Sequence, residues 1–286
     1  MVTDNLRLDT PRLPVIDLSL FDAGDPWRDH LAAQVDWAAS TFGFFYVVGH
    51  GIEATLVEAL MESSRRYFVR HREARHPQAE VPADTDGSYP DLPDVADIVG
   101  DYTAAVTGLS HKLMATFGRG LALGDSYFVD RYTGEPSVRL RIFNYPAVPR
   151  PSAHGASGQG ERQWGVAPHT DDGFLTLVRQ DDVGGLQLQH AGMWLDVPYV
   201  ADSFVVAIGG QLEHLTSGRY ISALHRVRNH SARDRLSMPF FFDPAFDAVL
   251  APIGAVGARA LRAQPDAAWS GIPLYRASAT YGESAR

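Results

Sequence analysis

A change in hydrophobic periodicity near residue 138 constrains the fold more than any other feature of this sequence. From Val138 onward, apolar and polar residues alternate in short runs that glycines and prolines separate. That pattern is typical of antiparallel β structure. Before this point the sequence reads as a mixture of helices and strands. We therefore predict a mainly β protein, in which helices of the N-terminal part pack against a β barrel.

Helix signals are strongest in the first third of the chain. Asp25-Pro26 provides a capping carboxylate and a proline at the first helical position, and Gly43 ends the pattern. The other elements expected in this part are a buried strand over 44–48, helices over about 53–70 and 95–117, and a surface loop over 71–92.

The β part divides into recognisable strands. Residues 186–197 read as a hairpin around the turn His190-Ala191-Gly192. The other expected elements here are strands over 204–208, 220–228 and 236–242, and a flexible insertion over 151–163.

Composition excludes several classes of site. The chain has 286 residues, 45% of them hydrophobic, with a net charge of −9 and no cysteine. The acidic balance argues against a nucleic-acid-binding surface, and any metal must be held by histidine and carboxylate. Since we find neither a signal-peptide pattern nor a stretch long enough to span a membrane, we expect a cytoplasmic protein. The sequence favours no particular oligomeric state.

Three residues have the spacing of metal ligands. His169 and Asp171 are two residues apart, and side chains at i and i+2 of a strand share a face. In the strand expected over 220–228, His225 alternates in phase with apolar residues, which puts it on the core side. A single histidine on an apolar face is more often a core residue, so the prediction rests on all three together. Two histidines and one carboxylate form the facial triad of non-haem Fe(II) oxygenases.

A second pair follows the last of these ligands. Arg235 and Ser237 are again at i and i+2 of an expected strand. Burying an arginine in a barrel is costly unless it meets an anion. A guanidinium and a hydroxyl on one inward face would make a clamp for a carboxylate.

At this point the sequence resembles a known family, the isopenicillin N synthase-like family of 2-oxoglutarate/Fe(II)-dependent dioxygenases. The similarity covers most of the chain, and its landmarks occur in the family's order. They are LPVIDLS, GFFYVVGHGI, NYP, HTDDGFLTLVRQDDVGGLQLQ, SALHRV and RLSMPFFFDP.

The resemblance implies a double-stranded β-helix, or jelly roll, with N-terminal helices packed outside. It also implies site residues at matching positions. Fe(II) would be bound by His169, Asp171 and His225, and 2-oxoglutarate by Arg235, Ser237 and Tyr145. Strand alternation from these positions places Arg141, Phe143 and Phe241 beside the substrate. Within a single domain of residues 1–286, we expect a helical and mixed N-terminal portion at 1–120, a jelly-roll core at 137–245 and a C-terminal segment at 246–286.

The implied activity is oxidation of a small molecule, such as a secondary metabolite, with O2 as oxidant and with release of succinate and CO2 from 2-oxoglutarate. Related halogenases have a small residue in place of the carboxylate, so Asp171 favours hydroxylation, desaturation or ring formation. Arg141 hints at an acidic substrate, and the two phenylalanines at an apolar or aromatic one. One departure from the family is the segment 71–92, which is shorter than usual and would leave the substrate site more open.

Three alternatives stay open on the sequence. Some members of the family keep the Arg-x-Ser pair but do not consume 2-oxoglutarate, so the chain could be a 2-oxoglutarate-independent Fe(II) oxidase. It could also be a non-catalytic module that binds metal and 2-oxoglutarate. A zinc hydrolase ranks lowest, because the sequence has no HExxH or comparable motif.

Overall fold

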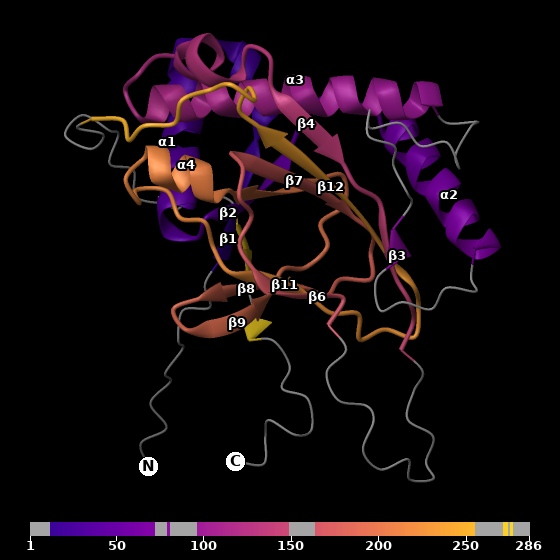
Figure 1. Ribbon diagram of the computed structural model, residues 1–286. Helices are drawn as coiled ribbons and strands as arrows, with labels where there is room; N and C mark the ends of the chain where they lie inside the picture. Colours follow the sequence, from indigo (N-terminus) through magenta and orange to yellow (C-terminus); the bar gives the residue numbers. More distant parts are fainter. Residues whose placement is uncertain are drawn as a thin grey trace, which may run out of the picture.

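The computed structural model describes residues 12–71, 79–80, 96–148, 164–254, 271–273 and 275–276. The insertion predicted over 151–163 lies outside these residues. Strands of the described part form two sheets that face each other as a jelly roll, and long helices lie across the outer side of the larger sheet (Figure 1). The predicted fold class is therefore confirmed.

The three predicted long helices are confirmed. They are α1 (Asp25–Thr41), α2 (Ala54–Arg70) and α3 (Ala96–Gly120). Pro26 occupies the first turn of α1, as its fixed φ favours. Gly43 follows the helix with φ 66°, and a Cβ at this position would lie 2.0 Å from the backbone oxygen of Ile221. Only glycine allows this close approach between the end of α1 and the segment around Ile221, which precedes His225.

The larger sheet has nine strands in the order β13-β1-β2-β10-β7-β12-β5-β3, and β4 also pairs with β12. Its members are β1 (Arg12–Asp17), β2 (Phe44–Val48), β3 (Ala79–Glu80), β4 (Ser137–Leu140), β5 (Phe143–Tyr145), β7 (Leu175–Gln180), β10 (Phe204–Ile208), β12 (Arg235–Asp243) and β13 (Gly271–Pro273). Strands from both ends of the chain thus join the sheet that the sequence placed within 137–245.

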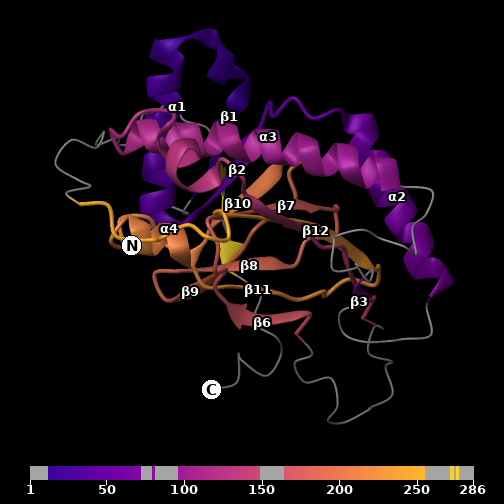
Figure 2. The same cartoon turned by 45° about the horizontal axis from the view of Figure 1, so that its top comes forward.

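The smaller sheet has five strands in the order β14-β9-β8-β11-β6. They are β6 (Val166–His169), β8 (Leu186–His190), β9 (Met193–Asp196), β11 (His225–Val227) and β14 (Tyr275–Arg276). In both views this sheet lies on the far side of the larger sheet from α3 (Figures 1 and 2). The predicted hairpin over 186–197 is confirmed as β8 and β9.

Two apolar clusters explain why the larger sheet is apolar on both faces. One lies between the sheet and the helices and includes Leu177, Met238 and Phe240. The other fills part of the barrel interior and includes Phe44 and Tyr145. A strand that is buried on both faces reads as a continuous apolar run, so its sequence does not reveal which face is which.

Three local predictions need correction. The strand predicted over 220–228 is paired only from His225 to Val227, because Tyr220 and Ile221 bond to side chains and backbone of α1 instead. Within the loop predicted over 71–92, Ala79–Glu80 pairs with β5. The six-residue helix α4 (Gly210–Leu215) was not predicted.

Shorter elements complete the described part: η1 (Leu18–Ala23), a turn of 3-10 helix, and η3 (Val129–Thr133), a turn of π-helix. No helix among the described residues is both long enough and apolar enough to cross a membrane.

Candidate active site

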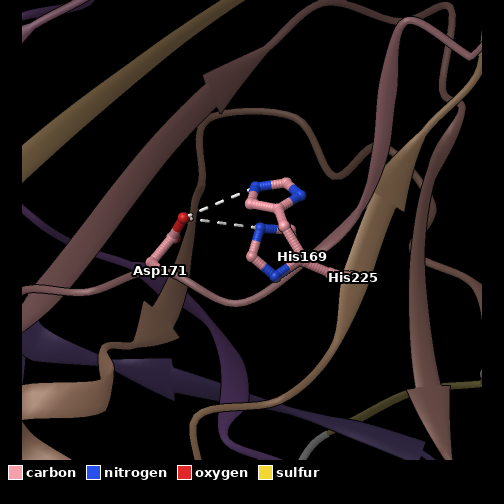
Figure 3. A group of neighbouring side chains, drawn as sticks. All are labelled: His169, Asp171 and His225. Carbon is pink, nitrogen blue, oxygen red and sulfur yellow. Dashed lines mark ion pairs between the residues drawn. The ribbon is translucent and has the colours of Figure 1, made fainter.

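The three predicted ligands come together at one end of the barrel. His169 ends β6, and its cross-strand partner is His225, the first residue of β11. Asp171 follows β6 by two residues. Its Oδ1 lies 3.6 Å from Nε2 of His169 and 3.7 Å from Nε2 of His225. Figure 3 shows both imidazoles turned toward this oxygen.

Backbone carbonyls hold both imidazoles in the same way. Nδ1 of His169 lies 2.9 Å from the carbonyl oxygen of Ala167, and Nδ1 of His225 lies 3.1 Å from that of Ala223. A carbonyl can only accept, so in each ring Nδ1 carries the proton and Nε2 offers its lone pair. Partners of this kind orient metal-binding histidines. The strand geometry thus aims two nitrogen lone pairs at the space beside Asp171.

The charges of the three groups suit a metal as well. Burial opposes ionisation of Asp171, but the nearby imidazoles of His169 and His225 and the hydroxyl of Thr176 hold its pKa below the usual value. The Asp171 carboxylate, 3.6 Å from Nε2, favours the protonated ring and raises the pKa of His169, whereas burial lowers that of His225. Asp171 is therefore a carboxylate and His225 a neutral ligand at neutral pH.

The turn that carries Asp171 is fixed by α4. The backbone N–H of Gly210 donates to the carbonyl oxygen of Asp171 at 2.7 Å, and the hydroxyl of Ser222 donates to the same oxygen at 3.3 Å. A Cβ on Gly209 would lie 2.0 Å from the backbone oxygen of Gly173. The start of α4 and the ligand turn are therefore in direct backbone contact.

Arg235 is the largest fully buried side chain among the described residues. Its Nη2 donates to Oε1 of Gln180 at 3.1 Å, and its guanidinium lies 5.0 Å from the ring centre of Tyr145. Nε and Nη1 have no hydrogen-bond partner within the described part of the chain. Burial lowers the pKa of Arg235, yet guanidinium stays charged in proteins. Burying a guanidinium with unpaired donors costs free energy, and an anion bound at Nε and Nη1 would reduce this cost.

The other predicted co-substrate residues border Arg235. Tyr145 is its cross-strand partner on β5, and Ser237 is buried two residues along β12. Asn229 donates to the carbonyl oxygen of Tyr145 at 2.8 Å. The structure thus brings all three predicted carboxylate-binding residues together on the inner face.

The predicted substrate residues share that face. Phe143 opposes Ser237, and Phe241 opposes Thr176, whose hydroxyl helps to lower the pKa of Asp171. Arg141 lies over the Phe143 ring, with its guanidinium 4.5 Å from the ring centre. Its side chain also donates twice to the carboxylate of Glu80 on β3.

Sequence reasoning missed four residues that border the site. They are Glu80, Arg139, Thr176 and Gln180. Thr176 and Gln180 are polar residues in phase on one strand, and that alternation was a usable signal. Arg139 is in phase with Arg141 and could have been found in the same way. Nothing in the Pro- and Asp-rich segment around Glu80 indicates that it pairs with β5.

Comparison with known proteins gives consistent matches. Residues 131–244 match the model of the 2OG-Fe(II) oxygenase superfamily, and residues 13–85 match that of the non-haem dioxygenase in morphine synthesis N-terminal family. 1-Aminocyclopropane-1-carboxylate oxidase 1 of Oryza sativa subsp. japonica is 30% identical over 86% of this chain and 83% of its own length. The chain belongs to the 2OG-Fe(II) oxygenase superfamily. It is an iron- and 2-oxoglutarate-dependent oxidoreductase, with O2 as the second co-substrate.

Two further matches extend over almost the whole length. A probable iron/ascorbate oxidoreductase of Dictyostelium discoideum is 29% identical over 98% of this chain and 94% of its own length. The crystal structure of a full-length Neurospora crassa protein in complex with alpha-KG superposes with a TM-score of 0.75 at 20% identity, covering 93% of this chain and 95% of that one. This structural match confirms the jelly-roll fold.

The residues of the site fit both Fe(II) and 2-oxoglutarate, the two groups that this superfamily uses. One ligand atom from each of His169, Asp171 and His225 lies within 4.8 Å of the others, and two imidazole nitrogens with one carboxylate oxygen suit Fe(II). The unpaired edge of the Arg235 guanidinium suits a carboxylate, since its planar fork matches that group.

Proposed function

We propose that this oxygenase oxidises a small organic molecule by hydroxylation, desaturation or ring formation, with conversion of 2-oxoglutarate into succinate and CO2. One observation carries the 2-oxoglutarate part of the proposal. Arg235 is 0% exposed, its Nε and Nη1 have no hydrogen-bond partner among the described residues, and it lies in the same barrel as the three metal ligands. A carboxylate brought by a ligand would pair with these two donors and so offset the cost of burying the guanidinium.

The residues divide the work as follows. His169, Asp171 and His225 would hold iron, which supplies the redox chemistry when bound. Arg235, Ser237 and Tyr145 would hold the distal carboxylate of 2-oxoglutarate. Asp171 fills a coordination position with a carboxylate, which favours oxygen chemistry over halogenation.

Named relatives support a small-molecule substrate. The rice relative is named for 1-aminocyclopropane-1-carboxylate, and the Neurospora crassa protein was solved with thymine as well as with alpha-KG. Both compounds are small and polar, although they differ in charge and ring type. A cytoplasmic location stays a prediction of the sequence.

Anaerobic titration of the Fe(II)-loaded protein with 2-oxoglutarate tests the proposal. A keto acid bound to Fe(II) through two oxygens gives a weak visible charge-transfer band, and we expect this band in the wild type. Arg235→Gln should weaken the apparent affinity at least about tenfold, because hydrogen bonds to charged groups contribute about 1.5–3 kcal/mol. Arg233→Gln is the matched control, since Arg233 is exposed and pairs with Asp182 on the surface.

The possible results separate the alternatives. Iron binding without a band would exclude 2-oxoglutarate as co-substrate and favour the 2-oxoglutarate-independent oxidase. A protein that binds no iron would refute the metal centre itself. A band without any succinate release on exposure to O2 and a broad panel of small molecules would favour the non-catalytic module.

A further inference from the structure

One row of side chains crosses the inner face of the larger sheet at the level of the metal centre. Its members, in cross-strand order, are Phe44, Ala207, Thr176, Phe241 and Arg139. Directly opposed residues on paired strands point to the same face. The row therefore forms a continuous floor that crosses five strands.

The row extends from the metal ligands to the guanidinium of Arg139. At one end the ring centre of Phe44 lies 5.2 Å from that of His225, and the Thr176 hydroxyl is close enough to lower the pKa of Asp171. At the other end lies Arg139, two strands beyond Thr176. Since paired strands lie about 4.8 Å apart, Arg139 begins about 10 Å from the metal side of the floor.

Arg139 lies in no ion pair within the described part of the chain. Its guanidinium lies 5.1 Å from the ring centre of Phe241, and its side chain is exposed. Among the described residues no side-chain hydrogen bond involves Arg139 either, although its charge partly offsets the rise that burial causes in the pKa of Asp243. The aromatic ring orients the guanidinium without neutralising it.

Arg141 differs from Arg139 in this respect. Glu80 accepts hydrogen bonds from both Nε and Nη2 of Arg141, a two-point pair that cancels the charge. Because of this pair, a substrate carboxylate would have to displace Glu80 in order to bind Arg141. The positive charge that remains on this face belongs to Arg139.

We propose that Arg139 binds the carboxylate of the substrate while Phe241 supports its apolar body, so that the substrates are small carboxylic acids with an apolar or aromatic body. The proposal rests on the proposed function, because it places the substrate between Arg139 and the metal. About 10 Å accommodates one ring or a short alkyl chain between the oxidised carbon and the carboxylate. Arg141 with Glu80 then forms a neutral wall beside Phe143.

The test compares a carboxylate with its uncharged isostere. 3-Phenylpropanoate and 3-phenylpropanamide are titrated into anaerobic protein loaded with Fe(II) and 2-oxoglutarate, and the shift of the visible band reports binding. We expect the acid to bind at least about tenfold more tightly, as one charged hydrogen-bond pair contributes about 1.5–3 kcal/mol. Arg139→Gln should remove this preference. Arg131→Gln is the matched control, because Arg131 also lies over an aromatic ring, that of Tyr127, away from the site.

Calorimetry on protein loaded with Zn(II) in place of iron measures the affinities of 3-phenylpropanoate and 3-phenylpropanamide independently of the visible band. An absent band with a calorimetric preference for the acid would count against the proposed function and leave the Arg139 site standing. A preference that survives in Arg139→Gln but disappears in Arg141→Gln would overturn our assignment, because the acid would then replace Glu80. Equal affinities of acid and amide, or no binding of either, would also overturn it.

Discussion

At the scale of single residues, two hydrogen bonds to backbone carbonyls determine which nitrogen of each histidine can bind the metal. The carbonyl oxygens of Ala167 and Ala223 fix the protons of His169 and His225 on Nδ1. Each ring therefore presents Nε2 to the metal, and a backbone carbonyl lies behind it. Because these partners are backbone groups, the orientation of the two imidazoles follows from the path of the strands.

Acid should release the metal from this centre, because a proton and the metal compete for Nε2 of His169. The nearby Asp171 carboxylate raises the pKa of His169 above its ordinary value of 6.5, so the protonated form persists to higher pH. We therefore expect the loss of affinity to begin above pH 6.5 and to steepen below it, by about tenfold per pH unit for each proton displaced. Chelator competition with Co(II) at about pH 8, 7 and 6 measures it.

His214→Gln is the control for this profile, since His214 is an exposed histidine on α4. It should leave the profile unchanged, whereas His169→Gln should abolish tight binding at every pH. An affinity that stays constant between pH 8 and 6 would contradict the role of His169 as a ligand.

The metal ligands could be predicted from the sequence because a strand has period two. His169 and Asp171 share a face by spacing alone, and His225 is in phase with apolar neighbours. Arg235 could be predicted because a buried arginine needs an anion. Glu80 could not, because its place depends on a pairing between β3 and β5 that is distant in sequence and has no local pattern.

At the scale of elements, α4 shows what sequence patterns miss. It has six residues, too few for a helical period to be recognised, and it begins at two glycines, which favour turns. Its first N–H groups nevertheless hold the turn that carries Asp171. An element without an apolar pattern of its own thus positions a metal ligand.

Substitutions at Gly209 and Gly210 test whether α4 holds the turn that carries Asp171. Gly209→Ala should destabilise the fold by about 1–3 kcal/mol and weaken metal binding, because the new Cβ would lie 2.0 Å from the oxygen of Gly173 and push α4 off the ligand turn. Gly210→Ala should change stability by about 0.5 kcal/mol or less, since its nearest neighbour is the Asp171 oxygen at 3.5 Å. Urea denaturation and Co(II) titration of both variants measure the difference. Equal effects of the two substitutions would show that α4 does not hold the turn.

At the scale of the whole molecule, a buried ionic contact joins the helical layer to the barrel. Asp36 of α1 accepts two hydrogen bonds from Arg219, at 3.0 and 2.6 Å, and a third from the Tyr220 hydroxyl at 3.1 Å. Both partners precede β11, which carries His225. Burial raises the pKa of Asp36 despite these donors. The apolar cluster beneath the helices also spans residues from Ile16 to Ile253, so we predict that helices and barrel unfold as one unit.

Asp36→Asn should destabilise the whole chain by about 2–4 kcal/mol, because it leaves the guanidinium of Arg219, whose side chain is 22% exposed, without its counter-charge. Asp29→Asn is the matched control: Asp29 also pairs with an arginine, Arg119, but its side chain is 61% exposed, and its loss should cost less than about 1 kcal/mol. Urea denaturation followed by tryptophan fluorescence, which reports Trp37 of α1 and Trp194 of β9 among others, and by circular dichroism should give one coincident transition in all three proteins. Two separated transitions in Asp36→Asn would mean that this contact joins two units that fold independently. In that case residues 1–286 would not form a single cooperative domain.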